Sequence, residues 1–157
     1  MNQRLNSSWW ALRIGFGVAP FLAGLDKFFN LLTNWKAYLN PLALRIIPVA
    51  PETFLHAIGV VEMIVGLAIL TRWTRLGSYV ASLWLVCIAL NLVAMGAFFD
   101  IAVRDVLLAL AAFTLARLTE VRQASTASSS TQSQALLVQL GTAPRLTRRL
   151  EQAAARL

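Results

Sequence analysis

Four apolar runs of about 20 residues constrain the fold of this chain more than any other feature. A helix of that length crosses the hydrocarbon core of a membrane. Because a backbone polar group without a hydrogen bond is costly in that core, each run is predicted to be a helix. The predicted spans cover residues 8–32, 53–70, 76–99 and 101–118. The fold class that follows is all-α, a transmembrane four-helix bundle.

The composition agrees with a multi-pass integral membrane protein. Hydrophobic residues make up 58% of the chain and charged residues 13%, whereas soluble domains carry about 25% charged residues. The formal net charge of +7 does not predict nucleic acid as a partner, because the basic residues flank apolar runs and form no patch with interleaved aromatics. Cys87 is the only cysteine, so an internal disulfide, a cysteine redox pair and a cysteine metal cage are all excluded.

The basic residues also predict the orientation of the spans. One end of the bundle collects most of them: Arg4, Arg72, Arg75, Arg117, Arg122 and the arginines of the C-terminal tail. The other end mixes both signs: Lys27, Lys36, Arg45 and Arg104 with Asp26, Glu52, Asp100 and Asp105. Lysine and arginine accumulate on the cytoplasmic side of membrane proteins. The N and C termini are therefore both predicted to be cytoplasmic.

Three segments lie outside the predicted spans. Residues 33–52 carry three prolines but are apolar, which predicts an interfacial segment across the outer mouth of the bundle, with one short helix after Pro41. Residues 119–134 are rich in serine and are predicted to be a flexible linker. Residues 135–157 form a basic amphipathic tail, for which three readings stay open: a helix on anionic lipid, a docking helix for a partner, or disorder.

Charged residues inside the first two spans fall on the same helical faces as glycines. The first face reads Arg13, Gly17, Pro20, Gly24 and Lys27, and the second reads His56, Gly59, Glu62 and Gly66. Small residues mark helix interfaces in lipid, so these charges are predicted to face the protein interior. From their depths, which differ by roughly 6 Å, Arg13 and Glu62 are predicted to form an intramembrane ion pair. The pair would fix how the helices dock, or Glu62 would belong to a proton path.

A second polar group is predicted at the outer end of the bundle. It comprises Asp26, Lys27, His56, Asn91, Arg104 and Asp105. With apolar walls below, these residues would form a pocket for a polar head group, such as a quinone ring, or for an anion. The alternative is a salt-bridged rim that fixes the helix ends.

The sequence predicts neither a metal site nor a catalytic residue. A single histidine disfavours a haem with two axial ligands. The sequence also shows no zinc site, phosphate-binding loop or Ser–His–Asp arrangement.

Three stretches together resemble the DoxX-like family of small four-helix membrane proteins: "LRIGFGVAPFLAGLDKF", "FLHAIGVVEMIVGLAIL" and "FFDIAVRDVLLALAAFTLARL". The residues that carry the resemblance are Arg13, Gly24, Lys27, Glu62, Gly66, Arg104 and Asp105. The resemblance implies a bundle in a bacterial-type inner (cytoplasmic) membrane, associated with redox chemistry. It also implies Lys27, Glu62, Arg104 and Asp105 as candidates near a quinone or anion site. The namesakes of this family are subunits of a thiosulfate:quinone oxidoreductase. This chain departs from them in its long tail and in having no cysteine pair for sulfur relay, and both features argue against a direct sulfur-oxidising role.

These observations predict an accessory integral-membrane subunit of a larger membrane redox complex, respiratory or photosynthetic, with no activity alone. Its partners would be the lipid bilayer and other membrane subunits, and its ligands would be lipid or quinone rather than a tightly held cofactor. The alternative is a quinone-reactive oxidoreductase subunit in which Lys27 or Arg104 holds the head group. A transporter is a weaker alternative, because the chain has no detectable internal repeat.

Overall fold

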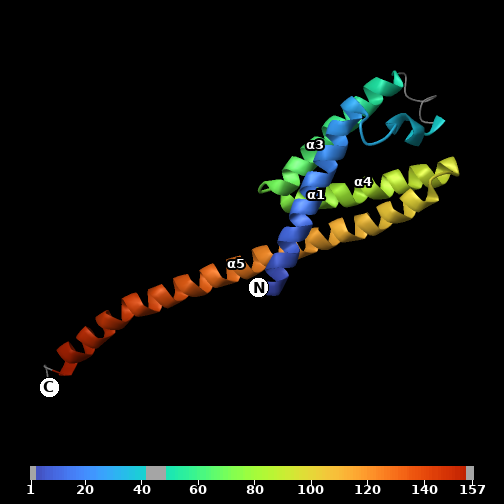
Figure 1. Cartoon of the computed structure of the whole chain (residues 1–157). Coiled ribbons are helices and arrows are strands. Elements are labelled where there is room, and N and C mark those ends of the chain that lie inside the picture. Colours follow the sequence, from blue (N-terminus) through green and yellow to red (C-terminus); the bar gives the residue numbers. More distant parts are fainter. Residues whose placement is uncertain (1–2, 42–48, 155–157) are drawn as a thin grey trace. The chain divides into compact units, whose positions relative to one another are not determined.

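The structure, a computed structural model, describes residues 3–41 and 49–154, with side chains described for 5–41 and 49–139. These ranges contain four α-helices and one short 3-10 helix, and the predicted all-α class is confirmed (Figure 1). The elements are α1 (Gln3–Phe29), η1 (Trp35–Tyr38), α3 (Pro51–Leu70), α4 (Thr74–Met95) and α5 (Phe99–Ala154).

Two of the described helices, α3 and α4, are long and apolar enough to cross a membrane. The crossing of the membrane by residues 8–32 and 101–118 stays a prediction, as does the cytoplasmic placement of both termini.

The chain divides into two compact units, residues 1–120 and 121–157. The four-helix packing and the candidate site both lie within the first unit.

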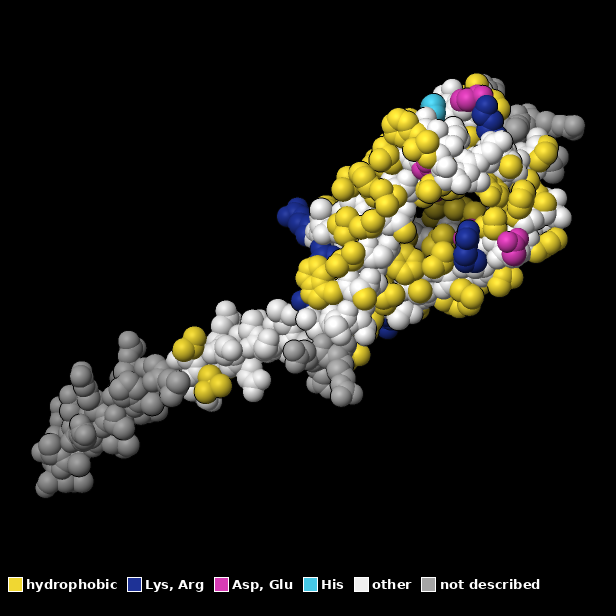
Figure 2. Space-filling model, in the orientation of Figure 1, with side chains coloured by type: hydrophobic (Ala, Val, Ile, Leu, Met, Phe, Trp, Pro, Cys, Tyr) yellow, Lys and Arg dark blue, Asp and Glu magenta, His cyan; other side chains and the backbone are white. Residues whose placement is uncertain are grey.

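Many large apolar side chains of the first unit are exposed, whereas alanines are prominent among its buried side chains. On α5, Ala109, Ala112 and Ala116 are 3% exposed or less, whereas Leu107 and Leu110 are 62% and 60% exposed. Hydrophobic side chains accordingly cover much of the face of the first unit seen in Figure 2. This distribution suits a bilayer, where lipid solvates the outer apolar surface and small residues allow helices to approach closely.

The glycines of α1 and α3 lie against each other, as the two glycine faces predict. A methyl group added at Gly59 would lie 2.5 Å from the carbonyl oxygen of Gly24. A methyl group at Gly66 would lie 2.5 Å from the carbonyl oxygen of Gly17. The two antiparallel backbones therefore touch, with Gly17 opposite Gly66 and Gly24 opposite Gly59.

Helices α4 and α5 pack through alanines and hydroxyl groups. One buried cluster joins all four helices and comprises Trp9, Ile69, Ala81, Ala112 and Leu115. The hydroxyl of Ser82 in α4 donates to the carbonyl oxygen of Ala109 in α5, at 2.9 Å. A second bond joins α1 to α5, where the indole of Trp9 donates to the hydroxyl of Thr119, at 2.8 Å. These bonds satisfy polar groups inside an otherwise apolar contact.

The segment after α1 is partly described. The Asp26 carboxylate accepts the backbone N–H groups of Leu31 and Leu32, and Asn30 takes a left-handed conformation with φ of 53°. The amide of Asn91 donates to the carbonyl oxygen of Tyr38, which ties η1 to α4. Residues 42–48, where the short helix after Pro41 is predicted, lie outside the described part.

The structure differs from the prediction in the serine-rich segment 119–134, which is helical rather than a flexible linker. Hydroxyl groups in this stretch donate to backbone carbonyls three or four residues earlier, as Ser125 does to Val121 and Ser128 to Ala124. Such bonds satisfy the hydroxyls within the helix, and the stretch has no glycine or proline to break it. In the basic tail 135–157, the side chains from residue 140 onward lie outside the described part.

Candidate functional site

The structure corrects the predicted ion pair of Arg13 with Glu62. The Arg13 guanidinium donates to the last carbonyl oxygens of α3: Nε to Ile69 at 3.0 Å, and Nη2 to Leu70 and Thr71 at 2.6 and 2.5 Å. It also lies over the rings of Trp9 and Trp10, 4.9 and 5.0 Å from their centroids. Arg13 thus caps the C-terminal end of α3, where a cation meets carbonyls that have no partner within the helix.

The glycine contacts explain why the predicted pairing fails. Since Gly17 lies opposite Gly66 in antiparallel helices, the position opposite Arg13 is Leu70. Glu62 lies eight residues from that position, about 12 Å along the axis. In addition, helical side chains lean toward the N-terminus of their own helix. Arg13 therefore leans toward the end of α3 and away from Glu62.

Glu62 pairs instead with Lys27. The Lys27 ammonium lies 2.5 Å from Oε2 of Glu62, and the two side chains are 5% and 9% exposed. The close contact of Gly24 with Gly59 positions both residues, since each charged residue follows its glycine by three positions. Because the helices are antiparallel and side chains lean toward their own N-termini, Lys27 and Glu62 lean toward each other.

Trp35 of η1 completes the site. The Lys27 ammonium lies 3.8 Å from the centroid of the Trp35 ring, within the range of a cation–π interaction. The Trp35 indole donates to Oδ2 of Asp26, at 2.8 Å. Asp26, whose side chain is buried, thereby orients the ring that covers Lys27.

Trp84 of α4 binds the Glu62 carboxylate through the oxygen that Lys27 does not contact. Its indole nitrogen lies 3.3 Å from Oε1 of Glu62 and donates to it. Sequence reasoning assigned no site role to Trp35 or Trp84. A signal was available for Trp84, because an indole N–H in the middle of an apolar span needs an acceptor. Glu62, in the preceding predicted span, was a candidate acceptor for this indole N–H.

Asp105 borders this site from α5. Its side chain is buried, and its electrostatic interactions include one with the Glu62 carboxylate. Its ion pair with Arg104 is long, with Nε 4.0 Å from Oδ1, and the Arg104 side chain is 66% exposed. We name the buried residues Asp26, Lys27, Glu62 and Asp105, together with the partly buried Trp35 and Trp84, the Lys27–Glu62 site.

The other two predicted pocket residues make different contacts. The ring of His56 stacks on Phe28, with centroids 4.5 Å apart and planes 6° apart. Asn91 binds the backbone of Tyr38, as described above, and lies against Met95. The structure therefore brings Asp26, Lys27 and Asp105 together with Glu62, whereas His56 stacks on Phe28 and Asn91 binds the backbone of Tyr38.

The charge of the Lys27–Glu62 site favours a neutral head group over an anion. Its buried ionisable groups are three carboxylic acids and one amine. A bound anion would meet more negative than positive charge there.

Figure 2 shows a hollow in the visible face of the first unit, rimmed mainly by hydrophobic side chains with a basic side chain beside it.

Comparison with protein families matches DoxX over residues 8–95, which is more than half of the chain. The chain therefore belongs to the DoxX family of small membrane proteins. The match includes Lys27, Glu62 and Trp84 and ends with α4, so Arg104 and Asp105 of α5 lie outside it. No curated protein and no solved structure matches the chain.

Proposed function

We propose that this DoxX-family protein is an accessory subunit of a larger membrane redox complex in a bacterial-type inner membrane. In this role the bundle occupies a place among other membrane subunits, contacts lipid or quinone, and performs no chemistry alone. The exposed apolar residues of α5 in the second unit supply the contact with a partner.

The observation that carries this proposal is the internal pairing of the buried polar groups. In the described part of the chain, each side-chain nitrogen or oxygen atom that is itself fully shielded from solvent has a hydrogen-bond partner. Arg13 caps α3, and Lys27 pairs with Glu62. Groups that satisfy one another specify how helices dock, which suits a structural subunit.

Exposed apolar side chains on α5 suit contact with a partner. In the second unit, Leu136, Leu137 and Val138 are 51%, 69% and 66% exposed and follow a helical stretch rich in serine. Clustered exposed apolar residues mark interaction sites.

Extraction of the full chain from its native membrane in mild detergent is expected to recover a partner in stoichiometric amount. Replacing Leu136 and Leu137 with Gln is expected to lower the recovered partner at least about tenfold, because the contact loses buried apolar area. The matched control is Ser128→Gln and Ser129→Gln on the same helix, which should keep the partner. An isolated monomer that sustains redox turnover without other subunits would contradict the proposal.

A second candidate function, a quinone-reactive subunit, is favoured by Asp105. Among the described residues, no cation lies closer to the Asp105 carboxylate than Nε of Arg104, at 4.0 Å. A buried carboxylic acid of this kind is suited to bind a quinone carbonyl or to exchange a proton with it. The Asp105→Asn and Arg104→Met variants of the assembled complex are expected to lose at least about tenfold in quinone reduction while keeping normal assembly. Unchanged kinetics in both variants would remove this candidate.

A further inference from the structure

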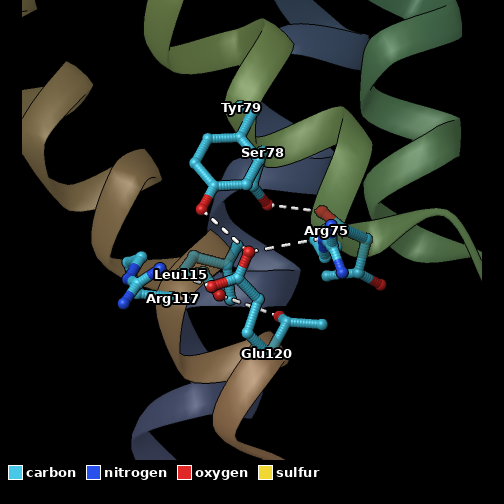
Figure 3. Close-up of polar contacts among 8 residues, drawn as sticks. Arg75, Ser78, Tyr79, Leu115, Arg117 and Glu120 are labelled. Carbon is cyan, nitrogen blue, oxygen red and sulfur yellow. Dashed lines mark hydrogen bonds and ion pairs between the residues drawn. The ribbon is translucent and has the colours of Figure 1, made fainter. Parts of the chain in front are cut away.

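A separate polar cluster lies at the end of the first unit where α4 begins. Glu120 of α5 accepts a hydrogen bond from the Tyr79 hydroxyl, at 3.0 Å, and from Nη1 of Arg117, at 2.6 Å. Nε of Arg75 lies 3.4 Å from the same carboxylate (Figure 3). We name Arg75, Tyr79, Arg117 and Glu120 the Glu120 cluster. It ties α4 to α5 and orders two arginines.

The arginines of the Glu120 cluster retain positive charge and unused donors. One carboxylate faces two guanidinium groups, each with five N–H donors. The side chains of Arg75 and Arg117 are 57% and 62% exposed, whereas that of Glu120 is 25% exposed. An anion reaching this end of the bundle therefore meets two ordered cations whose free donors face outward.

An exposed apolar strip continues from Arg117 along α5. Phe113, Leu110 and Val106 precede Arg117 by four, seven and eleven residues, which places them on the same helical face. They are 47%, 60% and 46% exposed. A phosphate at Arg117 would thus lie at the head of a strip long enough for part of an acyl chain.

Tryptophans mark the same end of the bundle as a membrane interface. Trp73, directly before α4, is 53% exposed, and Trp10 is 43% exposed. Trp10 belongs to this end because Arg13 both lies over its ring and donates to Thr71. Exposed indole rings favour the headgroup level of a bilayer.

We propose that the Glu120 cluster binds the phosphate of an anionic phospholipid, whose acyl chain follows Val106, Leu110 and Phe113. Guanidinium groups bind phosphate oxygens in a planar, bidentate manner, and basic pockets between helices bind anionic head groups. The proposal depends on the bundle lying in a membrane but not on a redox complex, so the two can fail separately.

The test is native mass spectrometry of the full chain in detergent, titrated with phosphatidylglycerol or with phosphatidylcholine of the same acyl chains. The wild-type protein is expected to bind phosphatidylglycerol more tightly. The Arg75→Gln/Arg117→Gln variant should lose about 25-fold in affinity for it, about fivefold per arginine, with unchanged binding of phosphatidylcholine. Lys36→Gln is the matched control, because Lys36 is another exposed cation paired with a glutamate, Glu52. It should change the affinity less than about twofold.

A second measurement needs no variant. Phosphatidylglycerol with a photoreactive acyl chain is expected to label residues 106–117 of the wild-type protein, and unlabelled phosphatidylglycerol should compete while phosphatidylcholine does not. Labelling elsewhere, equal loss of affinity in the Lys36→Gln control, or unchanged affinity in the double variant would overturn the proposal. Displacement of the lipid by millimolar glycerol 3-phosphate would also overturn it, since the cluster would then be a site for soluble phosphate.

Discussion

Replacing Lys27 with Met is expected to destabilise the bundle by about 3–5 kcal/mol, because it leaves the Glu62 carboxylate buried without its cation. Lys27 and Glu62 are 5% and 9% exposed, so water cannot replace the lost partner. The measurement is the free energy of unfolding of the full chain in detergent micelles. Glu62→Gln should cost less than Lys27→Met, because the amide oxygen still accepts from Trp84 and Lys27 is long enough to move toward the surface.

The double variant Lys27→Met/Glu62→Met separates the cost of an unpaired charge from the value of the pair. It is expected to recover most of the stability lost in Lys27→Met, since neither charge stays buried. Lys36→Gln is the control, because the Lys36–Glu52 pair is about half exposed and surface pairs contribute little. A Lys27→Met variant as stable as wild type would show that the pair is not buried in the folded protein.

Gly59→Ala is expected to destabilise the bundle by about 2–3 kcal/mol, because the methyl group would meet the backbone of α1 rather than a movable side chain. The added carbon would lie 2.5 Å from the carbonyl oxygen of Gly24, so α1 and α3 must move apart. The same unfolding measurement reports this loss. The shift should also weaken the Lys27–Glu62 contact, which the two glycines position.

Gly15→Ala is the matched control for this prediction. Gly15 is also a helical glycine of α1, but an added methyl group would have no atom within 4 Å. It should leave stability unchanged or raise it slightly, because alanine has the higher helix propensity. Equal losses in Gly15→Ala and Gly59→Ala would mean that the close approach of α1 and α3 is not what the glycines provide.

The packed faces of the first two helices were predictable because they depend on spacing alone. Gly17, Gly24, Gly59 and Gly66 recur at helical intervals, and only residues without a side chain let two backbones touch. The prediction that charges on those faces point inward was right for Lys27 and Glu62 for the same reason. The helical state of residues 119–134 was missed because serine content suggested a linker, whereas each hydroxyl can bond within its own helix.

The partner of each charge was not predictable in the same way. To predict that Glu62 pairs with Lys27 rather than with Arg13, one must know the register of the two helices and the direction in which their side chains lean. Trp35, which covers Lys27, comes from η1, and Trp84, which donates to Glu62, comes from α4, so no periodicity within one helix links them to the ion pair.

The sequence by itself determined that the chain forms apolar helices with glycine-lined contact faces, because hydrophobicity and spacing act locally along a helix. Only the tertiary structure decided which ionisable groups meet, because an ion pair depends on positions in three dimensions that helices of the same sequence pattern can reach in several registers. In this tertiary structure, Arg13 caps the C-terminal end of α3, Lys27 forms a buried ion pair with Glu62, and exposed arginines gather around Glu120.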